Sequence, residues 1–387
     1  MIGQVKRERS KEEGVKLGEN AGNKKKILMI TAFPPCSRTA GQDYTKRVIE
    51  ELVKLDYNVS LIIFEYPGHV IEVSHSVHIL KVCSPNLLNC VKYMKYHPFF
   101  TKRYDSRLGR YIQKISRTYD LVYFDFSQVM IYSIFLRHPC KLLMCHDIIY
   151  QRYSRRKIPF NVHWIKKTES RILNHGARVF TFSKKDCKLL EKNYHVKSQP
   201  VNFYLKTDKS FKYDETDITT DLFCFYGAWN RKENMESLLW FADKISKFIV
   251  SRIRYVVIGG GMDEKNKIKI ESDRRFKVIG FVENPLNEIA KCQALIAPLR
   301  KGAGVKVKVV DALTTGTPVI GTKVAFEGIE DNSDIALFHN AATKKDYINI
   351  LNRWRPVDKE VKEQAAEEFY NRYNTNHIVE IINEKML

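Results

Sequence analysis

The stretch KGAGVKVKVVDALTTGTPVIGTKVAFEGI, residues 301–329, decides the fold that we expect for this chain. Gly302 and Gly304 allow a positive φ and a close approach of the backbone to a ligand. They precede a predicted helix over about 305–315, whose free N–H groups and dipole favour an anion at its first turn. A Gly-Thr-Pro turn then ends the helix, and residues 319–321 predict a short buried strand of a parallel sheet. The segment therefore predicts an α/β unit with an anion site at its glycine loop.

Two charged residues share one face of this predicted helix. Lys308 and Asp311 are three residues apart, so their side chains lie on the same side. A cation near a helix start suits a diphosphate, and a carboxylate one turn further on suits a vicinal diol such as a ribose. The same spacing also fits a surface unit whose charged side chains are solvated, so the spacing alone leaves both interpretations open.

The segment resembles the donor-binding motif of retaining GT-B glycosyltransferases, the family-4 group that builds lipopolysaccharide, capsule and exopolysaccharide. The matching pieces occur in the family's order: Pro298-Leu299, Gly302-Ala303-Gly304, Lys308, Asp311-Ala312, Gly316-Thr317-Pro318-Val319-Ile320 and Glu327-Gly328-Ile329. The resemblance covers about residues 26–385. It implies an α/β GT-B fold, in which two Rossmann-like βαβ domains have parallel sheets facing across a cleft.

The resemblance also implies a set of site residues. Lys308 would hold the diphosphate of a nucleotide-diphospho-sugar donor and Asp311 its ribose, and with His146 they are the candidate catalytic residues. The candidate donor-binding residues are Gly41, Arg231, Lys232, Phe281, Val282, Gly302, Ala303, Gly304, Val305, Lys308 and Asp311. Cations and a helix N-terminus would neutralise the leaving group. Because the chain contains no Asp-x-Asp, we expect neither a metal nor another cofactor.

Three positions depart from the family pattern. At the first of them, Asp311 stands where relatives often carry the second of two glutamates. Relatives often carry a glutamate that touches the transferred sugar where this chain has Ala303. Ala228 stands where an arginine would clamp the diphosphate, so Arg231 and Lys232 are the available cations. The donor sugar is therefore left open.

The first half of the chain contributes the other candidates. Residues 26–31, 43–55 and 58–64 predict a β-α-β start, and Gly41 would be the counterpart of a family loop that closes on the donor; alternatively it only relieves a turn. His146 follows a predicted strand over 141–145, at the carboxyl edge of a parallel sheet where ligands collect. An isolated histidine there can also cap a loop, but the resemblance places His146 beside the reacting centre.

We divide the chain into four parts. Residues 1–24 are polar and charged and predict a disordered tail. Residues 25–205 predict an acceptor-binding Rossmann-like domain, and 206–365 a nucleotide-sugar-binding one that opens after a polar linker. Residues 366–387 predict the end of a long helix from about 358, which in relatives crosses back to the first domain.

Positive charge is concentrated in the first half of the chain. Residues 1–200 contain 36 Lys and Arg against 17 Asp and Glu, whereas residues 201–387 contain 29 against 27. This asymmetry predicts an anionic partner, either an acidic membrane surface or a nucleic acid. Segment 91–117 interleaves aromatic residues with Lys and Arg, as at a bilayer interface, although an ordinary helix that buries its apolar side fits the same pattern. No apolar run is long enough to span a bilayer.

We expect a retaining, metal-independent glycosyltransferase of cell-surface polysaccharide biosynthesis. Its partners would be the donor, a glycan or polyprenyl-linked anionic acceptor, and the anionic membrane surface; its location would be cytoplasmic, peripheral on the inner face of the membrane. The alternatives are a catalytically inactive homologue, a polyanion-binding protein and, from the same fold, a sugar epimerase. We expect no nucleic-acid partner, because the chain lacks helix-turn-helix, zinc and RNP-like signatures.

Overall fold

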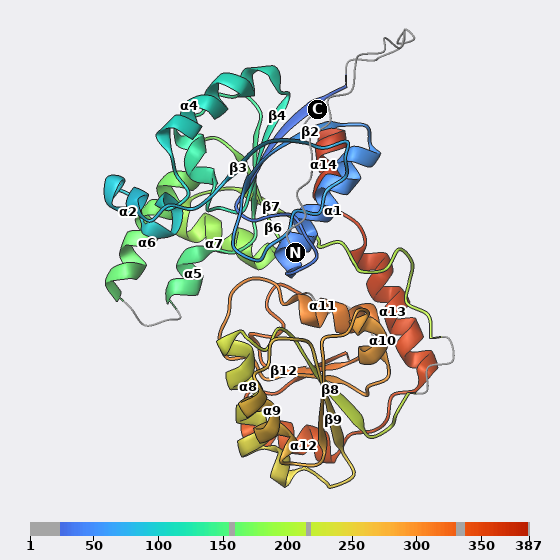
Figure 1. Cartoon of the computed structure of the whole chain (residues 1–387). Helices are drawn as coiled ribbons and strands as arrows, with labels where there is room; N and C mark the ends of the chain where they lie inside the picture. Colours follow the sequence, from blue (N-terminus) through green and yellow to red (C-terminus); the bar gives the residue numbers. More distant parts are fainter. Residues whose placement is uncertain (1–23, 155–158, 214–217, 330–336, 386–387) are drawn as a thin grey trace, which may run out of the picture.

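The computed structural model describes residues 24–154, 159–213, 218–329 and 337–385. They form two α/β domains, one above the other in Figure 1, and each domain is built around its own sheet. This architecture confirms the predicted fold class of two Rossmann-like units.

The first domain contains a seven-stranded sheet in the order β3-β2-β1-β4-β5-β6-β7. All of its strand pairs are parallel, so the carboxyl ends of the strands lie along one edge. The chain moves to opposite sides of β1, which creates a switch point between β1 and β4 at that edge. The strands are β1 (Lys26–Thr31), β2 (Asn58–Phe64), β3 (His78–Cys83), β4 (Leu121–Asp125), β5 (Lys141–Cys145), β6 (Arg178–Thr181) and β7 (Ser198–Pro200).

The second domain repeats the arrangement with a six-stranded parallel sheet in the order β10-β9-β8-β11-β12-β13. Its switch point lies between β8 and β11. The strands are β8 (Leu222–Tyr226), β9 (Arg254–Ile258), β10 (Phe276–Gly280), β11 (Leu295–Ala297), β12 (Val319–Gly321) and β13 (Phe338–Asn340).

Helices cover both faces of each sheet, which is why the strands are apolar runs rather than alternating ones. In β1, for example, Leu28 and Ile30 face one core and Ile27 and Met29 the other. The first domain has α1 (Ala40–Lys54), α2 (Leu88–Lys92), α3 (Pro98–Thr101), α4 (Ser106–Ile115), α5 (Ile149–Ser154), α6 (Pro159–Leu173) and α7 (Lys184–Tyr194), with 3₁₀ turns η1 (Ser116–Thr118) and η2 (Met130–Ile134). The second has α8 (Lys232–Lys244), η3 (Ser246–Phe248), α9 (Glu264–Glu271), α10 (Pro285–Ala290), α11 (Val307–Thr314), α12 (Lys344–Asn352) and α13 (Lys359–Tyr373), and α14 (Ile378–Lys385) follows.

The chain crosses between the domains twice, and the two crossings lie side by side. Phe203 packs in the first domain and Leu205 in the second. The chain returns after α13, and there the Nδ2 of Asn202 donates to the carbonyl oxygens of Tyr373 and Thr375, both at 3.0 Å. The red C-terminal helices in Figure 1 accordingly belong to different domains.

The final helix differs from the prediction. A single helix was expected from about 358 to 385, but the structure has α13 and α14 with a break between them. Asn376 in the break has a φ of 56°, a left-handed conformation that no α-helix continues through. In α14, Ile378, Ile381 and Ile382 are buried against the first sheet, so the chain end helps to form the first domain's core.

From Tyr96 onward, the aromatic and basic segment 91–117 packs its apolar side inward, whereas Val91 and Met94 are exposed. Tyr96, Phe100, Tyr104, Leu108 and Ile112 are all buried in the first domain's core. The interpretation as an ordinary helix that buries its apolar side is therefore correct for α4, and these residues do not form a bilayer-facing surface.

A buried lysine fixes α13 to the second domain. Lys362 has no exposed surface, and its Nζ donates to the carbonyl oxygens of Ala290 at 2.7 Å and Cys292 at 2.6 Å. Burial lowers the pKa of Lys362 to about 8. Since α13 packs on α11, these hydrogen bonds support the helix that carries Lys308 and Asp311.

We expect Lys362→Met to destabilise the protein by about 1–3 kcal/mol, because two interior carbonyl oxygens lose their donor. Urea unfolding measures the change. Lys212→Met is the control: it removes only an exposed ion pair with Glu367 at 3.7 Å, which contributes at most about 1 kcal/mol. Equal stability of the Lys362→Met and Lys212→Met proteins would contradict a supporting role for the buried amine.

Candidate active site

On the first-domain side, His146 is held by a carboxylate from the neighbouring strand. Asp125 ends β4 and His146 follows β5, so the parallel pairing of these strands places them together. The Nε2 of His146 lies 2.9 Å from Oδ1 of Asp125, and both side chains are buried. Thr31 and Thr45 donate hydroxyl hydrogen bonds to the other oxygen of Asp125. The contact assigns a proton to Nε2 and leaves Nδ1 as the other polar atom of the ring.

Aromatic rings fix the plane of His146. Its ring stacks on Phe126 with centroids 3.6 Å apart and an interplanar angle of 15°, and Tyr44 and Phe182 meet its ring edge-on. Phe126 has a φ of 70°, which is unusual for a residue with a side chain and marks a specially shaped turn after β4.

Gly41 lies directly against this histidine. A Cβ at Gly41 would come within 3.0 Å of Phe126 and 3.3 Å of Nδ1 of His146. The structure therefore brings Gly41 and His146 together. The prediction of a loop at Gly41 is wrong, because α1 begins at Ala40 and Gly41 lies in its first turn.

On the second-domain side, Lys308 is largely buried in the first turn of α11. Its Nζ donates to Oδ1 of Asn234 at 3.0 Å, and Nδ2 of Asn234 donates to the carbonyl oxygen of Ala228 at 2.8 Å. Among the residues that the structure describes, no carboxylate forms an ion pair with Lys308. The pKa of Lys308 is lowered to about 7, mainly by burial. The positive charges of Arg231 and Lys306 contribute to this lowering, and the negative charge of Glu233 opposes it.

Arg231 and Lys232 differ in their surroundings. Arg231 is the residue before α8, and its charge acts on Lys308. The side chain of Lys232 is 86% exposed and pairs with Glu236 at 3.8 Å. Of the two predicted cations, the structure therefore brings only Arg231 into electrostatic contact with Lys308.

The glycine loop, residues 302–304, contacts the first domain. Gly302 and Gly304 have φ values of 125° and 66°, as predicted. A Cβ at Gly304 would lie 2.5 Å from Oδ1 of Asp147 and 3.3 Å from the carbonyl oxygen of His146. The loop thus touches the segment that carries His146, and only a glycine fits there.

The neighbours of the loop complete this contact. Lys306, which precedes α11, donates to the carbonyl oxygens of Ala303 and Gly304. Val305 packs against apolar residues of both domains. Helix α11 starts at Val307, two residues later than predicted, so the loop is longer than the sequence indicated.

Asp311 is buried and already has a partner. Lys206, from the segment between the domains, donates to Oδ2 of Asp311 at 2.6 Å and to the hydroxyl of Tyr226 at 3.3 Å. Burial opposes the charge on Lys206, but the Asp311 carboxylate outweighs it and raises the lysine pKa overall. Any hydroxyl that reaches Asp311 would meet an ion pair rather than a lone carboxylate, which the sequence analysis did not predict.

Phe281 and Val282 follow β10 at the edge of the second sheet. Phe281 is 81% exposed and lies beside Gly260, whereas Val282 packs partly into the core. An exposed ring in this place offers a flat surface for stacking.

Glu169 positions the segment that carries His146. Its two carboxylate oxygens accept hydrogen bonds from the backbone N–H groups of Ile149 and Tyr150, and Tyr194 donates its hydroxyl at 2.6 Å. Burial raises the pKa of Glu169 to about 7. This carboxylate therefore caps α5, immediately after His146 and Asp147.

A second contact between the domains lies at α7. Ser183 caps this helix by accepting from the N–H of Asp186. A Cβ at Gly328 would lie 2.7 Å from the Cβ of Ser183, and Lys185 pairs with Glu327 at 2.7 Å.

Sequence reasoning missed several of these residues. Asp125 is the last residue of β4, and a strand end at the same sheet edge as His146 was the available signal. Lys206 lies in a polar linker, where nothing marked it. Within the described ranges, no cluster of three or more His, Cys, Asp or Glu side chains is arranged to hold a metal ion.

Residues 220–353 match the model of the family Glycosyl transferases group 1. An uncharacterized 44.6 kDa protein of the cps region of Klebsiella pneumoniae is 26% identical over 134 residues, which cover 32% of this chain and 34% of that protein. The aligned part thus spans about a third of this relative's length.

Two solved structures match nearly the whole chain. WaaG, a glycosyltransferase involved in lipopolysaccharide biosynthesis, has a TM-score of 0.61 at 12% identity, covering 93% of this chain and 98% of its own. HepE of Anabaena, in complex with UDP-glucose, has a TM-score of 0.59 at 14% identity, with the same coverage of 93% and 98%. These findings confirm the GT-B fold and the resemblance to group 1 glycosyltransferases, whose family model matches most of the second domain.

Folding stability should depend on the protonation of Lys308. Its pKa is about 7 in the folded protein and 10.5 as the ordinary value, so between these pH values the unfolded chain binds more protons. The contribution of Lys308 to stability therefore rises with pH from 7 towards 10.5, with a slope approaching ~1.4 kcal/mol per pH unit.

Urea unfolding of wild type and Lys308→Met between pH 7 and 9.5 measures this contribution. We expect the variant to be the more stable protein at pH 7 and the difference to shrink as the pH rises. A difference that stays constant over this range would show that Lys308 keeps an ordinary pKa.

Proposed function

We propose that this protein is a retaining, metal-independent glycosyltransferase that moves a sugar from a nucleotide-diphospho-sugar to a glycan or lipid-linked acceptor. The contact of Gly304 with the His146–Asp147 segment is the observation that carries the proposal. Through it, the glycine loop before α11 in the second domain meets the histidine that follows β5 at the carboxyl edge of the first sheet.

The donor diphosphate would bind at the first turn of α11. Lys308 would bind the diphosphate as a protonated amine, and Arg231 would provide a second cation. Since burial and like charges keep the pKa of Lys308 near 7, a bound dianion would draw a proton onto this amine. The arrangement is best suited to charge that grows on a departing diphosphate, which is the electrostatic task in glycosyl transfer.

The nucleoside would lie over the second sheet's edge. Lys206 and Asp311 offer a donor and an acceptor to vicinal hydroxyls, so both would position a ribose. Phe281 would stack on the base, and Val282 would contribute its backbone. HepE binds UDP-glucose, and uridine nucleotides are therefore the first candidates.

At the reacting centre, Asp125 holds the proton on Nε2 of His146, and Nδ1 faces Gly41. His146 would bind sugar oxygens beside the anomeric carbon. Retention would follow from front-side attack, with the leaving phosphate taking the acceptor's proton. Ala303 supplies no carboxylate, and this disfavours a sugar epimerase, which needs paired carboxylates near the anomeric carbon.

The surroundings of the relatives suggest the acceptor class. The similar Klebsiella protein lies in a cps region, and the similar structure WaaG is a glycosyltransferase involved in lipopolysaccharide biosynthesis. An anionic, membrane-linked acceptor of cell-surface polysaccharide synthesis would also suit the basic first half of the chain.

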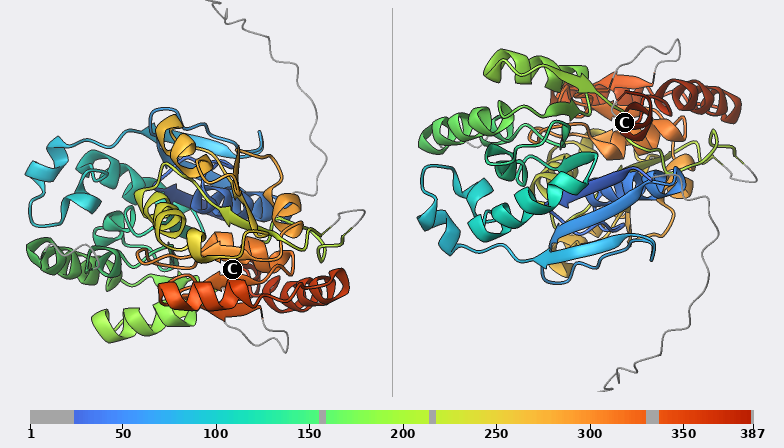
Figure 2. Two further views of the ribbon diagram at one scale, coloured as in Figure 1. Left: turned by 90° about the horizontal axis from the view of Figure 1, so that it is seen from below. Right: turned by 90° about the horizontal axis from the view of Figure 1, so that it is seen from above.

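Membrane binding would use α2 and its flanks. None of the helices that the structure describes is both long and apolar enough to cross a bilayer. Four apolar side chains are instead between 67% and 76% exposed and form what we call the α2 patch: Leu87, Leu88, Val91 and Met94. Exposed Lys92 and Lys95 flank them, and α2 lies at the outer margin of the first domain in each view (Figures 1 and 2). Apolar side chains among cations suit the interface of an anionic bilayer, with the protein peripheral on the inner, cytoplasmic face.

A thermal-shift panel of UDP, GDP, ADP and their sugar conjugates tests the donor site. We expect one nucleotide to stabilise wild type by roughly 2.7 kcal/mol at about 100 times its dissociation constant. The same ligand should shift Lys308→Met much less, because the diphosphate loses its cation. Lys232→Met is the matched control, since that side chain is exposed and paired elsewhere, and it should respond like wild type.

EDTA should leave these shifts unchanged. If no nucleotide stabilises wild type, with or without added Mg²⁺ or Mn²⁺, the transferase proposal fails and an inactive homologue or a polyanion-binding protein replaces it.

Co-sedimentation with phosphatidylglycerol-containing vesicles tests the membrane surface. Replacing Leu88 and Val91 by Asp should weaken binding at least about tenfold, since each side chain loses apolar burial and gains a repelled charge. Ile268→Asp introduces one charge at a side chain that is 65% exposed in the second domain, and should bind like wild type. Undiminished binding of the double variant would exclude the α2 patch as the anchor.

A further inference from the structure

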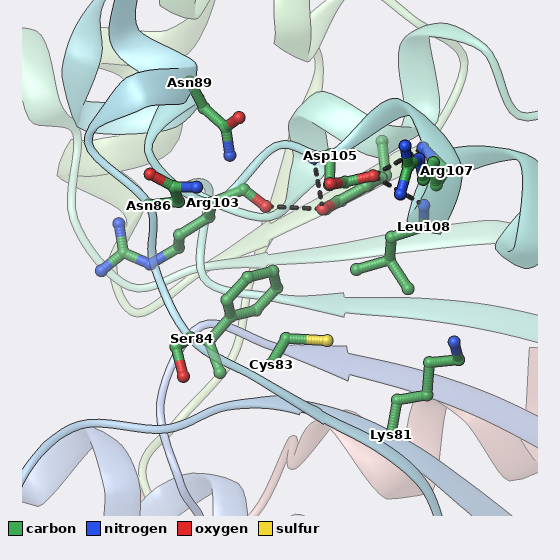
Figure 3. A pocket seen from close by; sticks show the side chains of 11 residues that line it. Lys81, Cys83, Ser84, Asn86, Asn89, Arg103, Asp105, Arg107 and Leu108 are labelled. Atoms are coloured by element: carbon green, nitrogen blue, oxygen red, sulfur yellow. Dashed lines mark hydrogen bonds between the residues drawn. The ribbon is translucent and has the colours of Figure 1, made fainter.

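A cavity of about 330 Å³ lies at the edge of the first sheet, beside the ends of β2 and β3 (Figure 3). Because the sheet is parallel, this is the same edge that carries Asp125 and His146. Polar and cationic side chains dominate its lining: Lys81, Ser84, Asn86, Asn89, Arg103 and Arg107. Its volume is in the range of small-molecule sites.

Arg103 is the buried charge of this cavity. Only 3% of the residue is exposed. Its Nη1 donates to the carbonyl oxygen of Phe99 at 3.2 Å, while its Nε has no hydrogen-bond partner. Among the residues described, no carboxylate forms an ion pair with it. Burial lowers the pKa of Arg103, although a guanidinium keeps its proton at any physiological pH.

The other contacts of Arg103 compensate its burial only in part. Its guanidinium carbon lies 5.2 Å from the ring centroid of Phe33 and 5.5 Å from that of Tyr66, in cation–π geometry. Lys102 is a neighbouring positive charge that repels Arg103. Burial and the charge of Arg103 together lower the pKa of Lys102. A buried charge without a partner lowers the free energy of unfolding unless a ligand of opposite charge pairs with it.

One carboxylate lines the cavity, but it already serves the backbone. Asp105 caps α4 by accepting from the N–H groups of Arg107 at 2.6 Å and Leu108 at 3.1 Å, as Figure 3 shows. Lys81, Arg103 and Arg107 outnumber it, so the lining carries a net positive charge.

Aromatic rings link Arg103 to the candidate active site. Phe33, on which Arg103 lies, meets Phe126 edge-on at 5.0 Å, and Phe126 stacks on His146. Two rings therefore separate the unpaired guanidinium from the histidine.

We propose that this cavity binds a phosphate group of the acceptor, with Arg103 as its buried partner and Lys81 and Arg107 at its mouth. A guanidinium presents paired N–H donors that match a phosphate. That the phosphate belongs to the acceptor rests on the proposed function, whereas phosphate binding by the cavity does not. The phosphate could belong to a soluble sugar phosphate or to a lipid diphosphate headgroup, and both present the same oxygens.

Calorimetric titration of wild type with inorganic pyrophosphate, with UDP present to occupy the donor site, tests the cavity. We expect Arg103→Gln to weaken pyrophosphate binding about tenfold or more, the loss of one charge-assisted hydrogen bond. Arg110→Gln removes the same charge from an exposed position on α4 outside the cavity, and should bind like wild type. If Arg103→Gln does not fold, the exposed Lys81→Ala replaces it and should weaken binding in the same direction.

Equal binding by wild type and the cavity variants would overturn the proposal, and so would equal weakening by Arg110→Gln, because diffuse attraction would then suffice. The titration is then repeated with glucose 1-phosphate and with a polyprenyl diphosphate in detergent. The ligand that binds more tightly identifies the source of the phosphate. If none of UDP, GDP and ADP binds, the transferase proposal fails, and the same titration on Lys308→Met still tests the cavity by itself.

Discussion

Gly304 joins the two domains through its contact with the segment that follows β5, and the candidate site depends on this contact. No side chain fits at this position, because a Cβ would lie 2.5 Å from Asp147. The contact joins two sheet edges, each of which collects ligands by its own topology. Gly328 against Ser183 and the pair Lys185–Glu327 secure the same interface, and α14 returns the chain end to the first domain.

Positive charges in this protein fall into two kinds. Lys206 pairs with Asp311, and Lys362 donates to backbone carbonyl oxygens, so both are satisfied from within. Lys308 and Arg103 have no such carboxylate among the residues described, although both are largely buried. Each unpaired charge lies at the carboxyl edge of its own sheet. A protein that keeps such charges out of water reduces its own stability at these places, and an anionic ligand recovers the loss on binding.

The departures from the family motif acquire a physical meaning in the structure. Where an arginine was expected, Ala228 offers its carbonyl oxygen to Asn234, which in turn orients Lys308. The shorter carboxylate of Asp311 is met by Lys206, which reaches it from the linker. At both positions a second residue of this chain, Asn234 or Lys206, contacts the site residue. This pattern fits a changed preference for the donor better than the loss of donor binding.

The sequence by itself determined the two parallel sheets, the strand-end position of His146, the glycine loop and the helix of Lys308 and Asp311. These features follow from local patterns, since apolar runs, glycines and helical spacing act over a few residues. Only the tertiary structure decided that Asp125 holds His146, that Lys206 pairs with Asp311, that α4 packs its apolar side inward, and that Arg103 lies in a cavity with no ion pair to any described residue. These facts depend on residues far apart in the chain, whose meeting is set by sheet order and domain closure, and no local pattern encodes that.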